Sequence, residues 1–318
     1  MSRVVIVGDC HWKRDPTSPY TRGLEKLFNY MMKEAYKDDN IIFTGDYFDE
    51  TFTHSDTRYI AEAFLVEHGK QVAIVTGNHE LSSSFGNALI PLKNLGIQVF
   101  SEPTNVIFGG YKVQFLPYLK KVSFMKEYGK ITEECDFSVS HVSPPGMNWG
   151  NPDEISLNFK AKIGHFYGHI HEPHEFTNEA GTHVVIGVPQ PTRQGEQYHQ
   201  PRVIVIEDGK WRSEDLPVFF TIEEVKYGEQ PKSKDNVINI VDAPSLEQVR
   251  ETYKDFNVRE EGVKVLRTIE KKDTKVTVDR MLKMDVPQKW IAWANENGIS
   301  NEVRDITADY LNRSSIAS

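Results

Sequence analysis

Five short motifs rich in Asp, Asn and His follow one another along the chain, and most of them come directly after a β-branched apolar run. Asp, Asn and His side chains bind hard or borderline divalent cations. An apolar run that stops at such a residue predicts a buried strand with a polar side chain at its end. Together the motifs predict a two-metal hydrolytic site. They are Asp9-Cys10-His11, Gly45-Asp46-Tyr47-Phe48-Asp49, Gly77-Asn78-His79-Glu80, His141 and Gly168-His169-Ile170-His171.

The first hundred residues alternate between apolar runs and amphipathic stretches. Strands are predicted at Val4–Val7, 41–43 and Val72–Val75, and apolar residues at helical spacing predict helices over 22–37 and 57–68. This order implies right-handed parallel crossovers. In open α/β sheets, sites form at the carboxyl ends of such strands. Three of the five motifs lie there.

From about residue 99 the pattern changes to short strands. A hairpin is predicted around Gly109-Gly110, and a tight turn at Asp208-Gly209. We expect this half of the core to be mostly antiparallel, and the whole core to consist of two sheets with helices outside. The further strands are predicted at 137–140, 166–167, 184–186, 203–206 and around Trp211.

A polar linker at 227–235 follows the core, and the residues beyond it show a different pattern of strands and helices. A strand is predicted at Val237–Val241 and another at 263–269, with a helix over 245–256 that Ser245 and Gln248 would cap between them. Two amphipathic helices, 288–297 with Trp290 and Trp293 and 301–311, complete a separate α+β module. The tryptophans are expected to pack in a core or an interface.

Composition bounds the class of protein. The chain has 318 residues, with 39% hydrophobic and 26% charged residues, and two cysteines that make no disulfide framework. This cysteine usage fits a reducing compartment, so we expect a cytoplasmic protein. No apolar run is long enough to span a membrane, so no membrane partner is expected. The net charge of −9 argues against a general nucleic-acid coat protein. It does not exclude a nuclease, because bound metal ions add local positive charge.

Phosphoester hydrolysis explains the motif residues. Two metal ions roughly 3.5–4 Å apart activate a water and neutralise the phosphoryl oxygens. Asp46 is the natural bridging carboxylate, since Gly45 leaves room beside it. Asp9 and His11 are expected on one ion and Asn78 on the other. The remaining ligands are His141, His169 and His171.

His79 directly follows a predicted ligand, so we expect it to face the substrate. A protonated imidazole there would donate a proton to the leaving oxygen. Asp49 is expected to orient that imidazole or a metal ligand.

The motif order resembles the signature of the calcineurin-like metallophosphoesterases over about residues 1–225. That resemblance implies a four-layer α/β/β/α sandwich of two mixed sheets, here with a smaller C-terminal α+β module. It implies that Asp9, His11, Asp46 and His171 bind one metal ion, that Asp46, Asn78, His141 and His169 bind the other, and that His79 is the catalytic acid. Glu80 stands where some members have Asp, and is not expected to touch a ligand.

Within the superfamily, the chain looks most like the SbcD nuclease branch. Phe48 matches a GDxFD form, and 185–196 resembles a Gly-Ser-Pro…Gly-Glu segment, although Val188 replaces the Ser. This implies a DNA exonuclease/endonuclease with two ions, most simply Mn²⁺ (or Mg²⁺, Fe²⁺ or Zn²⁺). It implies double-stranded DNA ends, an SbcC-like coiled-coil ATPase and a homodimer as partners. The implied domains are a nuclease domain (1–227), a DNA-capping module (228–280) and a helical ATPase-docking segment (281–318).

Two other functions remain open. One is a stand-alone phosphodiesterase or protein phosphatase, and the other is a scaffold with a degenerate site. His165 is expected to be a packed strand residue. Lys120 and Lys121 are expected in a loop, either solvated or in contact with phosphates. Surface or loop positions are expected for His54, His68, His174, His183 and His199.

Overall fold

The chain divides into two compact units, residues 1–265 and 266–318. The computed structural model describes residues 2–51, 55–68, 71–82, 86–119, 134–144, 159–192, 195–234, 236–259 and 263–265. The second unit, with the predicted helices 288–297 and 301–311, lies outside these residues, as do His54, Lys120 and Lys121. The predicted domain boundaries at 227/228 and 280/281 stay predictions.

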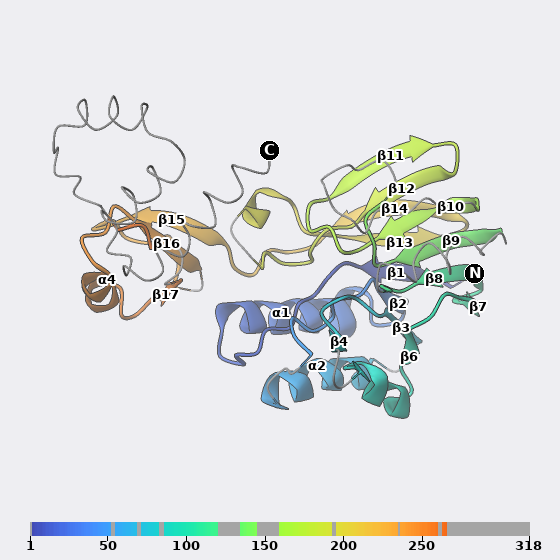
Figure 1. Ribbon diagram of the computed structural model, residues 1–318, viewed down its shortest axis with the longest axis horizontal. Coiled ribbons are helices and arrows are strands. Elements are labelled where there is room, and N and C mark those ends of the chain that lie inside the picture. Colours follow the sequence, from blue (N-terminus) through green and yellow to red (C-terminus); the bar gives the residue numbers. More distant parts are fainter. Residues whose placement is uncertain are drawn as a thin grey trace, which may run out of the picture. The chain divides into compact units, whose positions relative to one another are not determined.

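The first sheet is mixed and has six strands in the order β14-β13-β1-β2-β3-β6 (Figure 1). Strands β1, β2, β3 and β6 are parallel, whereas β13 pairs antiparallel with both β1 and β14. The parallel order predicted for the N-terminal strands is therefore confirmed. The strands are β1 (Val4–Val7), β2 (Asn40–Phe43), β3 (Val72–Val75), β6 (Gln98–Phe100), β13 (Arg202–Glu207) and β14 (Lys210–Asp215).

Strand β1 contributes to two cores because successive side chains point to opposite faces of a sheet. Val5 and Val7 pack with the helices α1 (Pro19–Tyr30) and α2 (Ser55–Glu67). Val4 and Ile6 pack instead against the second sheet. Figure 1 shows α1 and α2 together on the side of the first sheet away from the second. The β-branched runs are therefore buried on both faces, as parallel strands in a layered fold usually are.

The second sheet is also mixed, in the order β11-β12-β10-β9-β8-β7. The antiparallel arrangement predicted for this half is wrong at its centre, because β8, β9, β10 and β12 run parallel and only the outer strands β7 and β11 are antiparallel. The connections 117–134 and 141–160 exceed the dozen or so residues that a parallel crossover needs. The strands are β7 (Thr104–Phe108), β8 (Tyr111–Leu116), β9 (Cys135–Ser140), β10 (Ala161–Tyr167), β11 (His174–Asn178) and β12 (Gly181–Val185).

A third, smaller sheet has its own core. Strands β15 (Ile222–Lys226), β16 (Val237–Val241) and β17 (Asn257–Val258) are parallel, and helix α4 (Leu246–Thr252) joins the last two. The Oγ atom of Ser245 accepts from the backbone N–H of Gln248 at 3.2 Å, which is the predicted cap. The core of this sheet is formed by Val225, Ile238, Ile240, Ala243, Val249 and Tyr253.

The remaining elements are short. Helix α1 continues into a π-helical turn, η1 (Met31–Ala35), and two 3₁₀ turns follow later, η2 (Ile90–Leu95) and η3 (Glu196–Tyr198). Strands β4 (Leu81–Ser82) and β5 (Gly86–Asn87) form a two-stranded ribbon. Among the helices described, none has the length and apolar character to cross a membrane.

Candidate metal centre

The first two motif loops are joined by backbone hydrogen bonds beyond the ends of β1 and β2. His11 N donates to Asp46 O at 2.8 Å and Trp12 N donates to Tyr47 O at 3.0 Å. His11, Asp46 and His169 have positive φ angles of 49°, 44° and 72°. Such left-handed backbone is uncommon outside glycine and collects at functional sites. The surrounding structure therefore holds the backbone of these three predicted ligands in tight turns, and these turns set the orientation of their side chains.

One group of ligand atoms gathers Asp9, His11 and His171. The Nε2 atoms of His11 and His171 lie 3.0 Å apart, although the two residues are 160 positions apart in sequence. Asp9 Oδ2 lies 4.0 Å from Nε2 of His171. Asp9 is 1% exposed, and its carboxylate accepts from the Thr44 hydroxyl at 3.0 Å and from His169 N at 2.7 Å.

A second group gathers Asp46, His141 and His169. Asn78 lies with them, because its Oδ1 is 3.1 Å from both His141 Nε2 and His169 Nδ1. Asp46 Oδ2 lies 3.1 Å from Nε2 of His141. All seven predicted metal ligands therefore belong to one of two adjoining groups.

Asp46 connects the two groups. Its Oδ2 is 3.1 Å from His141 Nε2 in one and 3.8 Å from His11 Nε2 in the other. A Cβ added at Gly45, whose φ is 116°, would overlap the ring of His141. The glycine before Asp46 is thus required by close approach, as the sequence predicted.

Hydrogen-bond acceptors orient two of the imidazoles, and a carboxylate lies beside a third. His141 Nδ1 donates to Thr44 O at 2.9 Å, and His171 Nδ1 donates to the Glu196 carboxylate at 2.5 Å. His11 Nδ1 lies 3.1 Å from Asp49 Oδ1. With the proton on Nδ1, each ring presents the lone pair of Nε2 to its group. Acceptors of this kind typically hold metal-binding histidines in place.

The donor set fits divalent cations. Carboxylate, amide and imidazole donors suit Mn, Fe and Zn. Two nitrogens bound to one ion at about 2.1 Å and at right angles stand about 3.0 Å apart, which is the spacing of His11 and His171. Although burial disfavours the charged form of His141, Asp46 and Asp9 raise its pKa to about 10. The site therefore stabilises positive charge strongly.

His79 is not one of the seven predicted ligands, but it forms a third group of possible ligand atoms with His11 and Asp49. Its side chain is 39% exposed, and its Nε2 lies 3.9 Å from Asp46 Oδ2. Its Nδ1 donates to the backbone carbonyl of Asp49 at 2.5 Å, while its own N–H donates to Asp46 Oδ1 at 2.9 Å. The ring therefore has a fixed orientation and a solvent-facing edge.

Glu80 and Glu196 are the residues whose roles sequence reasoning missed. Glu80 is fully buried and accepts from the backbone N–H groups of Asp46, Gly77 and Phe48 at 3.2, 2.8 and 3.0 Å. It thus joins two motif loops without being a ligand. Burial, and then the charge of Asp46, raise the pKa of Glu80 to about 8. The position of Glu196 in the Gly-Glu segment was the feature of the sequence that could have indicated its role.

The other histidines lie elsewhere. His165 is fully buried in β10, so its predicted packing is confirmed. The surface positions predicted for His183 and His68 are wrong, because both are buried, at 0% and 7% exposure. His183 donates its Nε2 proton to Asn178 Oδ1, and His68 contacts Asp39 O, so each ring has a polar neighbour in the interior. His174 and His199 are about one-third exposed.

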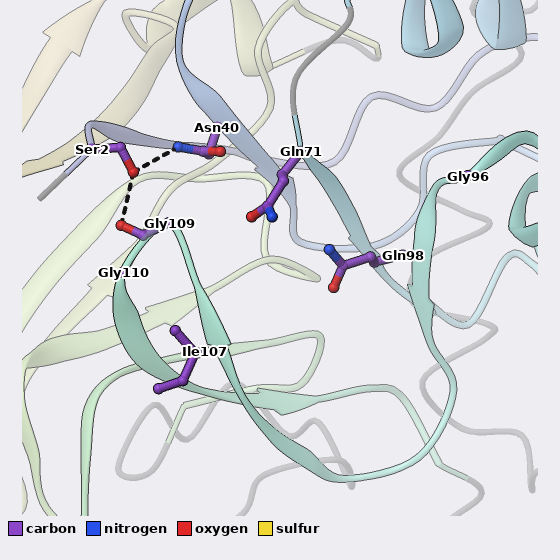
Figure 2. Close-up of a pocket in the computed structure, with 8 residues that line it drawn as sticks. All are labelled: Ser2, Asn40, Gln71, Gly96, Gln98, Ile107, Gly109 and Gly110. Atoms are coloured by element: carbon purple, nitrogen blue, oxygen red, sulfur yellow. Dashed lines mark hydrogen bonds between the residues drawn. The ribbon is translucent and has the colours of Figure 1, made fainter.

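A polar cleft of about 540 Å³ lies at the end of the first sheet away from the metal centre, where β2, β3 and β6 begin (Figure 2). Ser2 Oγ donates to Gly109 O at 2.9 Å and accepts from Asn40 Nδ2 at 3.0 Å. None of the residues that line the cleft is ionisable, so they offer nothing to phosphoester chemistry. They are Ser2, Asn40, Gln71, Gly96, Gln98, Ile107, Gly109 and Gly110.

Two solved structures are similar to the chain at low identity. A novel archaeal phosphodiesterase is 13% identical, with a TM-score of 0.39, over 67% of this chain and 99% of that one. The 5′-nucleotidase precursor from Thermus thermophilus is 15% identical, with a TM-score of 0.41, over 68% of this chain and 54% of that one. No curated protein matches the chain.

The family model described as Calcineurin-like phosphoesterase matches residues 2–173, more than half of the chain. The matched span contains every predicted ligand and His79. The two carboxylate–imidazole groups suit the metal-dependent chemistry of that family. The chain therefore belongs to the calcineurin-like phosphoesterase family and is a metal-binding hydrolase that acts on phosphoester bonds.

Proposed function

We propose that the protein is a metal-dependent DNA exonuclease/endonuclease, the nuclease subunit of an SbcCD-type complex. The observation that carries the hydrolytic part is the pair of ligand groups that Asp46 connects, with His79 beside them. The DNA part is supported by the sequence resemblance and by the module that follows the catalytic sheets.

The two groups would hold two divalent cations, with Mn²⁺ the most suitable. Asp9, His11, Asp46 and His171 would bind one, and Asp46, Asn78, His141 and His169 the other. Bound ions would supply charge to neutralise the phosphoryl oxygens and would lower the pKa of water so that hydroxide forms near neutral pH. Burial, and then the charge of His141, lower the pKa of His169 to about 4. The lone pairs of that ring are therefore available at neutral pH.

His79 would donate the proton that the leaving oxygen needs. Its Nδ1 proton is engaged with Asp49 O, so a second proton would reside on Nε2, at the edge of the ring nearest Asp46. A proton donor held by one hydrogen bond and partly open to solvent can approach the ester oxygen of a bound substrate. Asp49 is thus a positioning residue for this acid.

Three features support DNA as the substrate. Phe48 gives the loop the GDxFD form of the SbcD branch. Glu196, in the Gly-Glu segment of that branch, contacts His171. The third sheet, with its separate apolar core, follows the catalytic sheets where the branch carries its DNA-capping domain. We extend the proposal to double-stranded DNA ends as substrate, a homodimer, and an SbcC-like coiled-coil ATPase that docks on 281–318.

A second candidate is a stand-alone phosphodiesterase or protein phosphatase. The net charge of −9 favours it, because a DNA-binding surface is usually basic. This enzyme would not need the third sheet.

The test uses the full chain with Mn²⁺ and linear double-stranded DNA labelled at one end. The proposal expects release of label from the ends, loss of release after EDTA treatment, and recovery on adding Mn²⁺. If the chain hydrolyses methyl p-nitrophenyl phosphate and leaves both linear and circular DNA intact, the nuclease proposal fails and the second candidate replaces it. Deletion of residues 281–318 is expected to abolish ATPase binding and to leave the metal content unchanged.

A further inference from the structure

Tyr198 is the most exposed of the large apolar side chains in the described part of the chain, at 81%. Single exposed apolar side chains are common and need no function. Tyr198 differs from them in its position, because it ends the 3₁₀ turn η3, which begins at Glu196. Glu196 in turn holds the predicted metal ligand His171.

Described residues on both sides of Tyr198 are held by hydrogen bonds. The Glu196 carboxylate accepts from Thr192 N at 2.6 Å and from Thr192 Oγ1 at 2.9 Å, besides holding His171. Gln190, 1% exposed, donates to Pro217 O at 2.7 Å. Gln200 donates to Leu216 O at 2.9 Å on the other side of η3. Because the backbone here is already held in place, a side chain on it can bind a ligand without the entropic cost of ordering a loop.

Tyr198 is also close along the chain to a residue that contacts the metal centre. Two residues of chain span at most about 7 Å, so its Cα stands within that distance of the Cα of Glu196. Glu196 Oε1 is 2.5 Å from the Nδ1 atom of His171. The Cα of Tyr198 therefore lies no more than about 7 Å from that of a residue that contacts the metal centre.

The chemistry of the segment selects the kind of group. Residues 195–201 contain no Lys or Arg, and their one carboxylate is engaged with His171 and Thr192. Arg193 precedes these residues in the sequence and Arg202, which pairs with Glu175, follows them, so residues 195–201 themselves supply no Lys or Arg to a phosphate. The segment offers an aromatic face, which stacks with a nucleobase of any identity.

We propose that Tyr198 is a stacking platform for a nucleobase next to the scissile phosphate. The inference rests on the proposed function, since its ligand is the base of a nucleic-acid phosphodiester. Tyr198 would act on substrate binding and not on the metal ions or on proton transfer. It would also make cleavage indifferent to base identity but sensitive to the absence of a base.

The test compares two small esters with the same leaving group, thymidine 5′-(p-nitrophenyl) phosphate and methyl p-nitrophenyl phosphate. With Tyr198→Ala, KM for the thymidine ester is expected to rise roughly 5- to 150-fold, the range that one base–aromatic stack gives. The kcat value and the kinetics of the methyl ester are expected to stay unchanged. Tyr198→Trp should restore KM. The matched control is Tyr59→Ala, which removes a tyrosine on α2 that is 75% exposed.

Two outcomes overturn the inference. In one, Tyr198→Ala leaves KM for the thymidine ester unchanged; in the other, it impairs both esters equally or lowers the metal content, which marks a structural role. The nuclease proposal is judged separately, on end-labelled DNA. If the wild-type chain leaves DNA intact but shows the Tyr198-dependent preference for the thymidine ester, the nuclease proposal is refuted and the stacking role of Tyr198 is supported. If the Tyr198→Ala variant degrades DNA as well as the wild type, the nuclease proposal is supported and the stacking role of Tyr198 is refuted.

Discussion

The backbone carbonyl of Asp49 accepts a 2.5 Å hydrogen bond from Nδ1 of His79, and so fixes the ring of the proposed acid. The carboxylate of the same residue serves a different histidine, since its Oδ1 lies 3.1 Å from Nδ1 of His11. Although burial opposes its ionisation, His11 and then Lys13 lower the pKa of Asp49 to about 2. One residue thus contacts the proposed acid through its main chain and a predicted metal ligand through its side chain.

Asp49→Asn is expected to separate these two contacts. The substitution keeps the carbonyl that holds His79 but removes the charge that faces His11. Affinity for the metal ion at His11 should fall about 10- to 100-fold, while the rate at saturating Mn²⁺ stays near that of the wild type. Titration of activity with Mn²⁺ measures both quantities. Asp208→Asn, in a tight turn away from the metal centre, is the control, and a lower rate at saturating metal would place the Asp49 carboxylate in the chemical step.

His79→Gln is expected to lower kcat by about 10²- to 10⁴-fold on DNA, because the leaving alkoxide loses its proton donor. The loss should be much smaller with a nitrophenyl ester, whose leaving group needs no proton. Metal content, measured by elemental analysis, should match that of the wild type. Equal losses with both leaving groups, or a loss of metal, would contradict the assignment of His79 as the acid.

Glu196→Ala is expected to weaken metal binding about 10- to 100-fold, because His171 loses the acceptor that fixes its ring. Burial opposes ionisation of Glu196, but the bond with His171 holds its pKa at about 2, so the carboxylate is charged at neutral pH. Glu196→Gln keeps an acceptor without the charge and should show an intermediate affinity. Calorimetric Mn²⁺ titration of the three proteins gives the order, and an affinity unchanged in both variants would refute a positioning role.

Glu80→Ala is expected to destabilise the fold by about 3 kcal/mol or more, because three buried backbone N–H groups lose their acceptor. Urea denaturation of the metal-free chain measures the loss. Glu62→Ala, which breaks an i,i+4 pair with Arg58, is the control and should cost no more than about 0.5 kcal/mol. A similar cost for both variants would show that Glu80 does not hold the two loops together.

The buried pair His165 and His183 is expected to make the protein less stable in mild acid. Their rings stack at 4.8 Å, and Ser138 and Tyr167 contact their Nδ1 atoms at 2.8 Å. Burial lowers the pKa of His165; burial and then His165 lower that of His183 to about 4. The unfolded chain therefore binds more protons below about pH 6.5.

The contribution of His183 to stability is complete above about pH 6.5 and falls by up to about 1.4 kcal/mol per pH unit toward pH 4, and that of His165 falls in the same direction. Urea denaturation between pH 7.5 and 5.0 measures the slope. His183→Gln is expected to reduce it, and His199→Gln, at a partly exposed position, to leave it unchanged. Identical slopes in all three proteins would exclude the buried pair as the cause.

Much of the fold could be predicted from local pattern. The runs at Val4–Val7 and Val72–Val75 are too apolar for a half-exposed strand, and the intervening helical periodicity indicates parallel crossovers. Strand direction in the second sheet could not be predicted, because an apolar run has no direction of its own. The pairing of β8, β9 and β10 decides it, and that pairing joins strands that are far apart in the sequence.

The sequence by itself determined the inventory of ligand-type side chains, the strand ends that carry them, and the Gly45 that lets Asp46 approach His141. Local chemistry and spacing suffice for these. Only the tertiary structure decided which side chains meet: His11 with His171, Asp49 with two histidines through two different atoms, Glu80 with two loops, and Glu196 with His171. The contacts of Asp49 and Glu80 form where the ends of β1, β2 and β3 meet in the first sheet, and the contact of Glu196 with His171 forms between loops of the second sheet. The contact of His11 with His171 exists only once the two sheets have packed.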